Sequence, residues 1–151
     1  MDGGLRSGDA GFSLLELMVS VAVLAVLAVG VGLSTGAVVP GAERDAQRFQ
    51  RTFEQIWALA ILARQEQGLE ITPRGLSLSR RTAEGWEEAR RLYDWRGQTR
   101  LVSSSPVPVG TPRIRLRSDG GTSAFTVSFS GGGETFRCAS DGWSGLTCAP
   151  E

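Results

Sequence analysis

The sequence predicts an α+β protein in which a long N-terminal helix packs on antiparallel β-sheets. Three patterns support this class. An almost uninterrupted apolar run opens the chain, an amphipathic segment follows it, and short alternating segments with glycine- and proline-containing turns fill the C-terminal half. Helical and strand patterns that occupy separate parts of a chain are typical of α+β domains.

The apolar run predicts a membrane-spanning helix over residues 12–39. Between Phe12 and Leu33 nearly every side chain is apolar, and Glu16 is the one charged residue. About twenty such residues, at roughly 1.5 Å rise per residue, cross the hydrocarbon core of a bilayer. Glycines near the end of the run, followed by Pro40, predict either the end of the helix or a loosened helix that continues.

Glu16 is an unfavourable residue in such a helix and calls for a partner. Insertion scales put a carboxylate at the bilayer centre at a cost of about 2.5–3.5 kcal/mol. If the chain were cut after Gly11, Phe12 would carry a cationic α-amine that could neutralise Glu16 of a neighbouring subunit. The alternative is that Glu16, one turn into the helix, extends to the lipid headgroups.

A second helix, with one apolar face, is predicted over residues 42–67, and Gly68 is predicted to cap its C-terminal end. This face needs a sheet to pack on, and the segment 69–151 reads as a β-rich body. The apolar residues recur at intervals of three and four, which is typical of a core-facing stripe: Ala46, Phe49, Phe53, Ile56, Trp57, Ala60 and Ala63.

Seven segments are candidate strands. Phe125, Val127 and Phe129 alternate with Thr126 and Ser128 in the clearest of these, as expected of a half-buried strand. The candidates are residues 69–71, 76–80, 86–95, 99–103, 114–116, 125–129 and 135–138.

Composition argues against catalysis and against a general affinity for nucleic acid. Lys and Arg together number 16, as do Asp and Glu, and His is absent. A neutral chain has no overall field to attract nucleic acid. Histidine, the commonest general base and the commonest zinc ligand, is therefore missing, and the sequence contains no phosphate-binding loop and no nucleophile motif. We therefore expect no enzyme, no metal and no cofactor.

The two cysteines, Cys138 and Cys148, lie close together near the C-terminal end. In an oxidising compartment they would form a disulfide that closes a glycine-rich loop, worth about 2–3 kcal/mol in the chain-entropy model. Free thiols remain an alternative. A redox pair is a weaker one, because such pairs are usually spaced C-x-x-C.

Arg113, Arg115 and Arg117 alternate, so in a strand they share one face. Three guanidinium groups on one face could contact the phosphates of DNA without sequence specificity. A solvated strand face, or salt bridges between subunits, is the interpretation that the neutral chain favours.

The start of the chain resembles the class III signal of type IV pilins and type II secretion pseudopilins. The shared pattern is a Gly, a Phe, a Glu at fixed spacing and an apolar helix, here G-F-S-L-L-E-L-M-V-S-V-A-V-L-A. The resemblance implies that residues 1–11 are a leader, that a prepilin peptidase cuts between Gly11 and Phe12 and methylates Phe12, and that Glu16 serves assembly. A secretory signal peptide and an uncleaved anchor are the alternatives.

The body, residues 40–151, contains a helix that ends near A-R-Q-E-Q-G, a tryptophan-containing hairpin and the late segment S-D-G-G-T-S-A-F-T-V-S-F. By this pattern most of residues 49–129 resembles the minor pseudopilin H of type II secretion and its FimT-like relatives. This implies a subunit held in the bacterial inner membrane by one span, with its C-terminal domain in the periplasm. The implied partners are the prepilin peptidase, other major and minor pseudopilins and the inner-membrane assembly platform. The calcium site of the family's major subunit is not expected, because the C-terminal segment has too few acidic residues for a cage of six to eight oxygens.

Two other functions remain open at this point. One is a FimT-like minor type IV pilin or competence pseudopilin that binds DNA through the arginine face. The other is an anchored periplasmic domain of different function.

Overall fold

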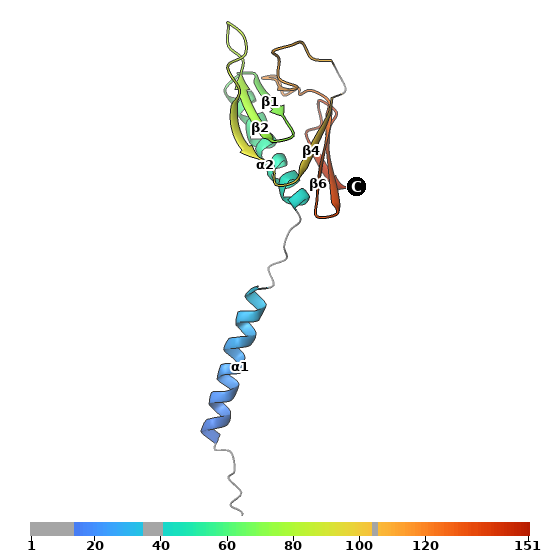
Figure 1. Ribbon diagram of the computed structural model, residues 1–151. Coiled ribbons are helices and arrows are strands. Elements are labelled where there is room, and N and C mark those ends of the chain that lie inside the picture. Colours follow the sequence, from blue (N-terminus) through green and yellow to red (C-terminus); the bar gives the residue numbers. More distant parts are fainter. Residues whose placement is uncertain (1–13, 35–40, 104–105) are drawn as a thin grey trace, which may run out of the picture. The chain divides into compact units, whose positions relative to one another are not determined.

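The computed structural model describes residues 14–34, 41–103 and 106–151 (Figure 1). The chain divides into two compact units, Met1–Val38 and Val39–Glu151. In the first unit, α1 (Leu14–Ser34) is a helix of 21 residues. From Leu14 to Ala25 its side chains are exposed, and most of them are apolar.

No helix among the described residues meets the length and hydropathy that a membrane span requires. The span predicted over residues 12–39 extends beyond the described part of the chain and stays a prediction. The proposed break around Gly36 and Pro40 also lies outside the described residues.

The second unit begins with α2 (Gly41–Leu62), which follows the predicted apolar stripe. One face is buried and the opposite face, in the first four turns, carries charged and amide side chains. This division explains why the segment is helical, because only a period near 3.6 residues gathers these apolar side chains on one side. The buried residues of α2 are Ala42, Asp45, Ala46, Phe49, Phe53, Ile56 and Ala60.

The predicted C-terminal end of this helix, at residue 67, is wrong: α2 ends at Leu62. Arg64 adopts φ 51°, its N–H donates to the carbonyl of Ile61, and the N–H of Gln65 donates to the carbonyl of Ala60. These bonds satisfy the last carbonyls of the helix in the manner of a Schellman cap. An arginine, where a glycine is usual, therefore terminates α2.

Gly68, the predicted cap, lies inside a strand. A Cβ at this position would come within 2.3 Å of Pro112 Cγ and 2.8 Å of Trp86 Cζ3. The glycine is required because two side chains cross the strand here, and no left-handed backbone is involved.

In the described part of the chain, eight strands form two antiparallel four-stranded sheets, with the orders β3-β2-β1-β5 and β4-β6-β7-β8 (Figure 1). The predicted α+β class with antiparallel sheets is confirmed. The first sheet contains β1 (Gln67–Ile71), β2 (Gly75–Arg80), β3 (Arg90–Asp94) and β5 (Ile114–Leu116), and the second contains β4 (Gln98–Ser103), β6 (Phe125–Gly131), β7 (Glu134–Ser140) and β8 (Thr147–Pro150).

Two of the strands differ from the expectation. The candidate strand over residues 86–95 is regular only from Arg90 to Asp94, and Trp86 forms an isolated bridge with Arg81. The terminal strand β8 was not predicted. Its four residues show no alternation of apolar and polar side chains. They form a strand because they pair with β7, in a register that sets Cys138 opposite Cys148.

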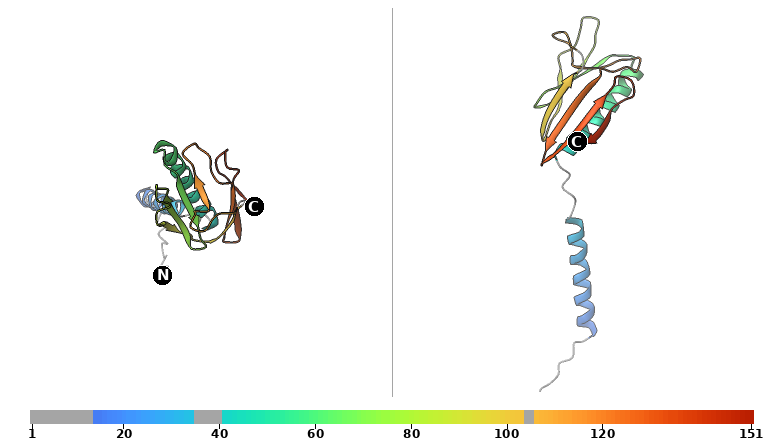
Figure 2. Two further views of the ribbon diagram at one scale, coloured as in Figure 1. Left: turned by 90° about the horizontal axis from the view of Figure 1, so that it is seen from above. Right: turned by 90° about the vertical axis from the view of Figure 1, so that its right-hand side faces the viewer.

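The hydrophobic core lies between α2 and the inner faces of both sheets, with the largest contact to β6 and β7 (Figure 2). Phe49 is its centre: the ring is fully buried, with centroids 5.6 Å from Phe129, 6.1 Å from Phe125 and 6.3 Å from Trp95. Aromatic pairs at such distances and inclined angles add about 0.5–1.5 kcal/mol each beyond the area that they bury.

A buried carboxylate fixes the start of α2 to the turn between β3 and β4. Asp45 is 2% exposed, and its Oδ2 accepts hydrogen bonds from the backbone N–H groups of Arg96 (2.8 Å) and Gly97 (2.9 Å). Gly97 is needed at this turn because a Cβ would lie 2.4 Å from the carbonyl oxygen of Ser130. Asp45 thus satisfies two backbone donors where the helix meets both sheets.

We predict that Asp45→Ala lowers the free energy of unfolding by about 2–4 kcal/mol, because it removes two hydrogen bonds to a charged group and leaves two N–H groups unsatisfied. Chemical denaturation of the full-length chain in detergent measures this. Glu54→Ala, which removes an exposed carboxylate of the same helix, should change the value by less than about 0.5 kcal/mol. Equal effects of the two substitutions would contradict the assignment.

Candidate functional sites

The N-terminal motif enters the described structure at the first turn of α1. Glu16 lies in that turn, and the hydroxyl of Ser20 donates to the Glu16 carbonyl at 2.8 Å. Gly11 and Phe12, the residues of the predicted cleavage site, are outside the described part of the chain. Helical geometry places Glu16 on the same side of α1 as Ser20, one turn further along.

The three predicted arginines are all exposed: Arg115 lies in β5, where Ile114 and Leu116 are buried, and Arg113 and Arg117 flank the strand. Two of them are ion-paired. Arg113 pairs with Glu70 at 3.4 Å, and Arg117 pairs with Asp119. Glu70 also accepts a hydrogen bond from the Arg113 backbone N–H at 3.1 Å.

Only Arg115 of this set lacks an ion pair among the described residues. Arg117 and Asp119 also stabilise each other's charge: the backbone N–H of Gly121 and the Arg117 guanidinium hold the pKa of Asp119 below its ordinary value. The predicted arginine face therefore exists as a surface, but two nearby carboxylates offset most of its positive charge.

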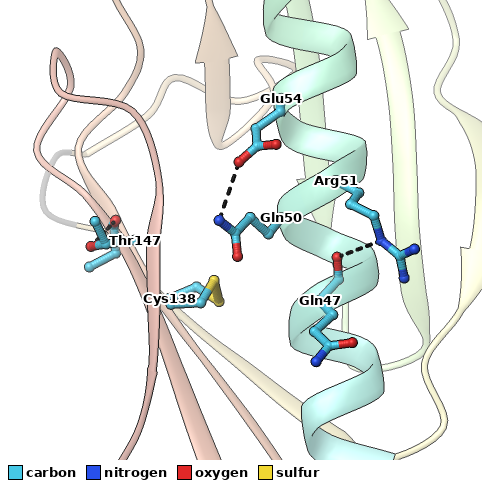
Figure 3. The surroundings of a disulfide bond; sticks show 8 residues. Gln47, Gln50, Arg51, Glu54, Cys138 and Thr147 are labelled. Carbon is cyan, nitrogen blue, oxygen red and sulfur yellow. Dashed lines mark hydrogen bonds between the residues drawn. A yellow bond between two sulfur atoms is a disulfide. The ribbon is translucent and has the colours of Figure 1, made fainter.

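Cys138 and Cys148 form a disulfide between directly opposed residues of β7 and β8. Cys138 is fully buried, and the bond lies on the side of its strand that faces α2, near Gln50 (Figure 3). Gln50 in turn donates to Glu54 at 3.2 Å along the helix. The disulfide closes the base of the loop that joins β7 to β8.

Asp141 organises this loop. Its Oδ1 accepts from the backbone N–H groups of Trp143 and Ser144, both at 2.8 Å, and its Oδ2 accepts from the Ser144 hydroxyl at 2.8 Å. These three donors lower the pKa of Asp141 to about 2. A carboxylate that accepts hydrogen bonds from the backbone N–H groups two and three residues later forms a self-contained turn.

The turn holds Trp143 outward, with 73% of its surface exposed. The loop is tied to the β5–β6 connection, because the Thr122 N–H donates to the Gly142 carbonyl at 2.8 Å. Gly142 has φ +100° and a Cβ there would lie 3.1 Å from the Thr122 carbonyl. Trp143 is therefore an exposed aromatic side chain on a loop fixed at several points.

The same region contains the end of α2. Trp57 Nε1 donates to the Gly120 carbonyl at 2.9 Å, and a Cβ on Gly120 would lie 3.9 Å from Ile61 Cδ1. On Gly121 a Cβ would lie 3.7 Å from the Trp143 ring. Four side chains at the C-terminal end of α2 form a surface that we name the distal surface: Trp57, Ile61, Leu62 and Trp143. Of these, Ile61 is 41% exposed and Leu62 is 81% exposed.

Sequence reasoning did not find Asp45 or the distal surface. Asp45 reads as one more polar residue of an amphipathic helix, and only its contact with a turn about fifty residues later makes it structural. A signal for Trp143 was present, since an aromatic residue between two glycines in a short disulfide loop has little room to be buried. Within the described residues, no group of three or more His, Cys, Asp or Glu side chains could hold a metal ion.

Comparison with known proteins assigns the motif and the fold. Residues 6–32 match the family described as the prokaryotic N-terminal methylation motif. Two structures of the minor pseudopilin EpsH from the type II secretion system of Vibrio cholerae are similar to the chain. One has a TM-score of 0.60 at 21% identity and covers 74% of this chain and 95% of that chain. The other has 0.55 at 23%, covering 73% and 95%.

The fold is pilin-like. No curated protein sequence matches the chain. The predicted resemblance to pilin-like proteins is confirmed, both by the methylation motif and by the arrangement of helix and antiparallel sheets shared with the minor pseudopilin.

We predict that the Asp141 carboxyl titrates at about pH 2, well below its ordinary 3.8. Because its pKa is lower in the folded than in the unfolded chain, the ionised carboxylate stabilises the loop above about pH 3.8, and this stabilisation is lost as the pH falls towards 2. The chemical shift of the carboxyl carbon, followed by NMR, measures the midpoint. Ser144→Ala removes one donor and should move it upward; an unmoved midpoint near 3.8 in the unaltered chain would contradict the turn.

Proposed function

We propose that the chain is a minor pseudopilin of a type II secretion system, a structural subunit of the fibre that helps to export folded proteins across the outer membrane. The observation that carries the proposal is the combination of the methylation motif at residues 6–32 with a body that matches EpsH over 95% of that chain. Either feature alone would suit a broader set of pilin-like proteins.

In this proposal the chain begins as a precursor in the bacterial inner membrane, with its body in the periplasm. A prepilin peptidase removes residues 1–11 and methylates Phe12. The disulfide between Cys138 and Cys148 agrees with an oxidising compartment. The mature subunit then joins other major and minor pseudopilins at an inner-membrane assembly platform.

The exposed apolar surface of α1 gives the physical reason for assembly. Leu14, Leu15 and Leu17 are 61–79% exposed in the isolated helix. Such side chains are stable in lipid or against other helices, and water disfavours them by about 25 cal/mol per Å² of apolar area. A subunit that leaves the bilayer must therefore rebury α1, which packing against neighbouring helices in a fibre provides. The proposed role includes no catalytic step.

The DNA-binding alternative depended on three free guanidinium groups. Because Arg113 and Arg117 are paired with carboxylates, contact with phosphates would require those ion pairs to be exchanged. Each phosphate contact adds to the affinity for DNA through the counterions that it releases. One arginine without an ion pair therefore gives little affinity for DNA at physiological salt. The geometry supports a structural subunit better than a nucleic-acid-binding one.

We predict that the mature protein begins at Phe12 and carries an N-methyl group. Mass spectrometry of the protein isolated from membranes measures both the start and the added methyl mass. Gly11→Leu, which replaces the residue before the cut, should leave the precursor full-length and unmethylated. An unaltered protein that retains residues 1–11, or that starts elsewhere, would exclude the proposed processing.

We predict that Glu16→Ala leaves cleavage and methylation intact but reduces incorporation into the fibre by at least about tenfold, since pairing with a neighbour's α-amine selects one docking position in a low dielectric. Sheared fibre fractions, probed for this subunit, measure incorporation. Glu88→Ala, which removes an exposed carboxylate of the second unit, is the control, and this variant should be incorporated into the fibre normally. Full incorporation of the Glu16→Ala variant would refute the role.

A further inference from the structure

The second sheet has a free edge at β4. This strand lies at one margin of the sheet (Figure 2) and pairs with β6 along one side only. In the described part of the chain, no backbone hydrogen bond reaches its other side. The strand at the opposite margin, β8, has four residues and includes Pro150, which has no N–H to donate. A free row of N–H and C=O groups is a template on which another extended chain can pair.

The turn between β6 and β7 determines which groups of β4 are free. Residues 132–133 have φ 68° and 83°, which makes a two-residue hairpin turn whose flanking residues bond to each other. Because the direction of bonding alternates along a strand, Ser128 bonds towards β4, where its partner is Arg100. The backbone N–H and C=O groups of Thr99 and Leu101, on either side of Arg100, therefore face the free edge.

A hollow of about 340 Å³ lies beside this edge. One wall is formed by residues 99–101 of β4, and another by residues 70–73, at the end of β1 and in the turn after it. Thr99 is only 9% exposed, and its hydroxyl has no hydrogen-bond partner among the described residues. Buried hydroxyls without a partner are uncommon in folded proteins, and this one marks the wall of the hollow as an incomplete contact.

The charges that line the hollow favour an acidic occupant. Glu70 and Arg113 neutralise each other: their side chains pair at 3.4 Å, and the backbone N–H of Arg113 also donates to Glu70. Arg100, the third charged residue of the lining, is exposed and has no ion pair in the described part of the chain. One uncompensated positive charge therefore remains, and a carboxylate is the group that complements it.

We propose that the hollow holds an extended, acidic segment of a different protein, which pairs with the free edge of β4. The backbone of this segment bonds to the free N–H and C=O groups of Thr99 and Leu101 and adds a fifth strand to the second sheet. A carboxylate of the segment pairs with Arg100. The main-chain bonds hold the segment in place, while Arg100 and the half-buried Leu101 select its side chains.

The kind of partner follows from the proposed function, on which this part of the inference rests. A minor subunit is outnumbered by the other subunits of its fibre, so its neighbours there are different proteins. Pairing at a strand edge also adds a directional contact, because backbone hydrogen bonds fix the register of the added strand. Packing between apolar helices does not supply this, because hydrophobic burial is non-directional.

Photo-cross-linking of the full-length chain in the membranes of its native cells tests the contact. Pro73, an exposed residue that lines the hollow, is replaced by p-benzoylphenylalanine, and mass spectrometry identifies the cross-linked peptide. The expected product joins position 73 to a segment of a different protein that contains Asp or Glu. The same probe in place of Ala83, an exposed residue between β2 and β3, should not give this product.

Four results of this experiment would overturn the proposal. These are a product with a second copy of this chain, a product with lipid, a product with a segment that has no acidic residue, and the absence of any product.

Charge reversal tests the assigned ion pair. Arg100→Glu should lower the yield of the position-73 product about threefold to fivefold, because one favourable charge contact becomes unfavourable. Arg90→Glu is the matched control and should leave the yield unchanged, since Arg90 is another exposed arginine of a marginal strand without an ion pair among the described residues. Both variants should unfold at the temperature of the unaltered chain. Equal yields for the two variants would overturn the contact with Arg100.

Hydrogen exchange, resolved to single residues, tests the strand pairing itself. In the cross-linked product the amide hydrogens of Thr99 and Leu101 should exchange at least about tenfold more slowly than in the subunit alone, because each gains a backbone acceptor. The amide of Arg100 already bonds towards β6 and should not change. Unchanged exchange at all three residues would overturn the pairing.

The outcome is separable from the proposed function. A correctly processed subunit that is incorporated into the fibre but gives no position-73 product would overturn the strand pairing alone. The same product formed by a chain that is never cut between Gly11 and Phe12 would support the strand pairing and reject the fibre role.

Discussion

The fold depends on the burial of one helical stripe between two sheets. Phe49 and Phe53 are fully buried, and each contacts rings or aliphatic side chains of strands that are distant in the sequence. Removing one such side chain from a core costs about 3–5 kcal/mol, a large part of a typical domain's stability of about 5–15 kcal/mol. Both sheets have few residues and short strands, so neither would be stable without the helix.

The sequence was sufficient for features that depend on local periodicity. The stripe of α2 and the alternation of Phe125, Val127 and Phe129 each place apolar residues on one face, and the structure buries them as expected. The two-sheet arrangement was not predictable, because strand order depends on contacts between residues far apart in the sequence. β8 is the extreme case: four residues without a pattern become a strand because β7 pairs with them.

The candidate sites follow the same division. The spacing of the arginines correctly placed them on one face, but the partners that offset their charge were invisible: Glu70 lies in a strand 43 positions before Arg113. Gly68 shows the converse error. A glycine after a helical pattern suggests a cap, whereas here it makes room for Trp86 and Pro112, and the left-handed position falls on Arg64.

The two units face different physical demands. From Leu14 to Ala25, α1 presents mostly apolar and exposed side chains, which contact with water disfavours, whereas the body buries its own core and has a mixed, nearly balanced charge. Within the described residues, every residue of the hydrophobic core belongs to the second unit, so this core is formed by the body's own elements. The exposed apolar end of α2 departs from that separation: its last turns are apolar on the solvent side as well.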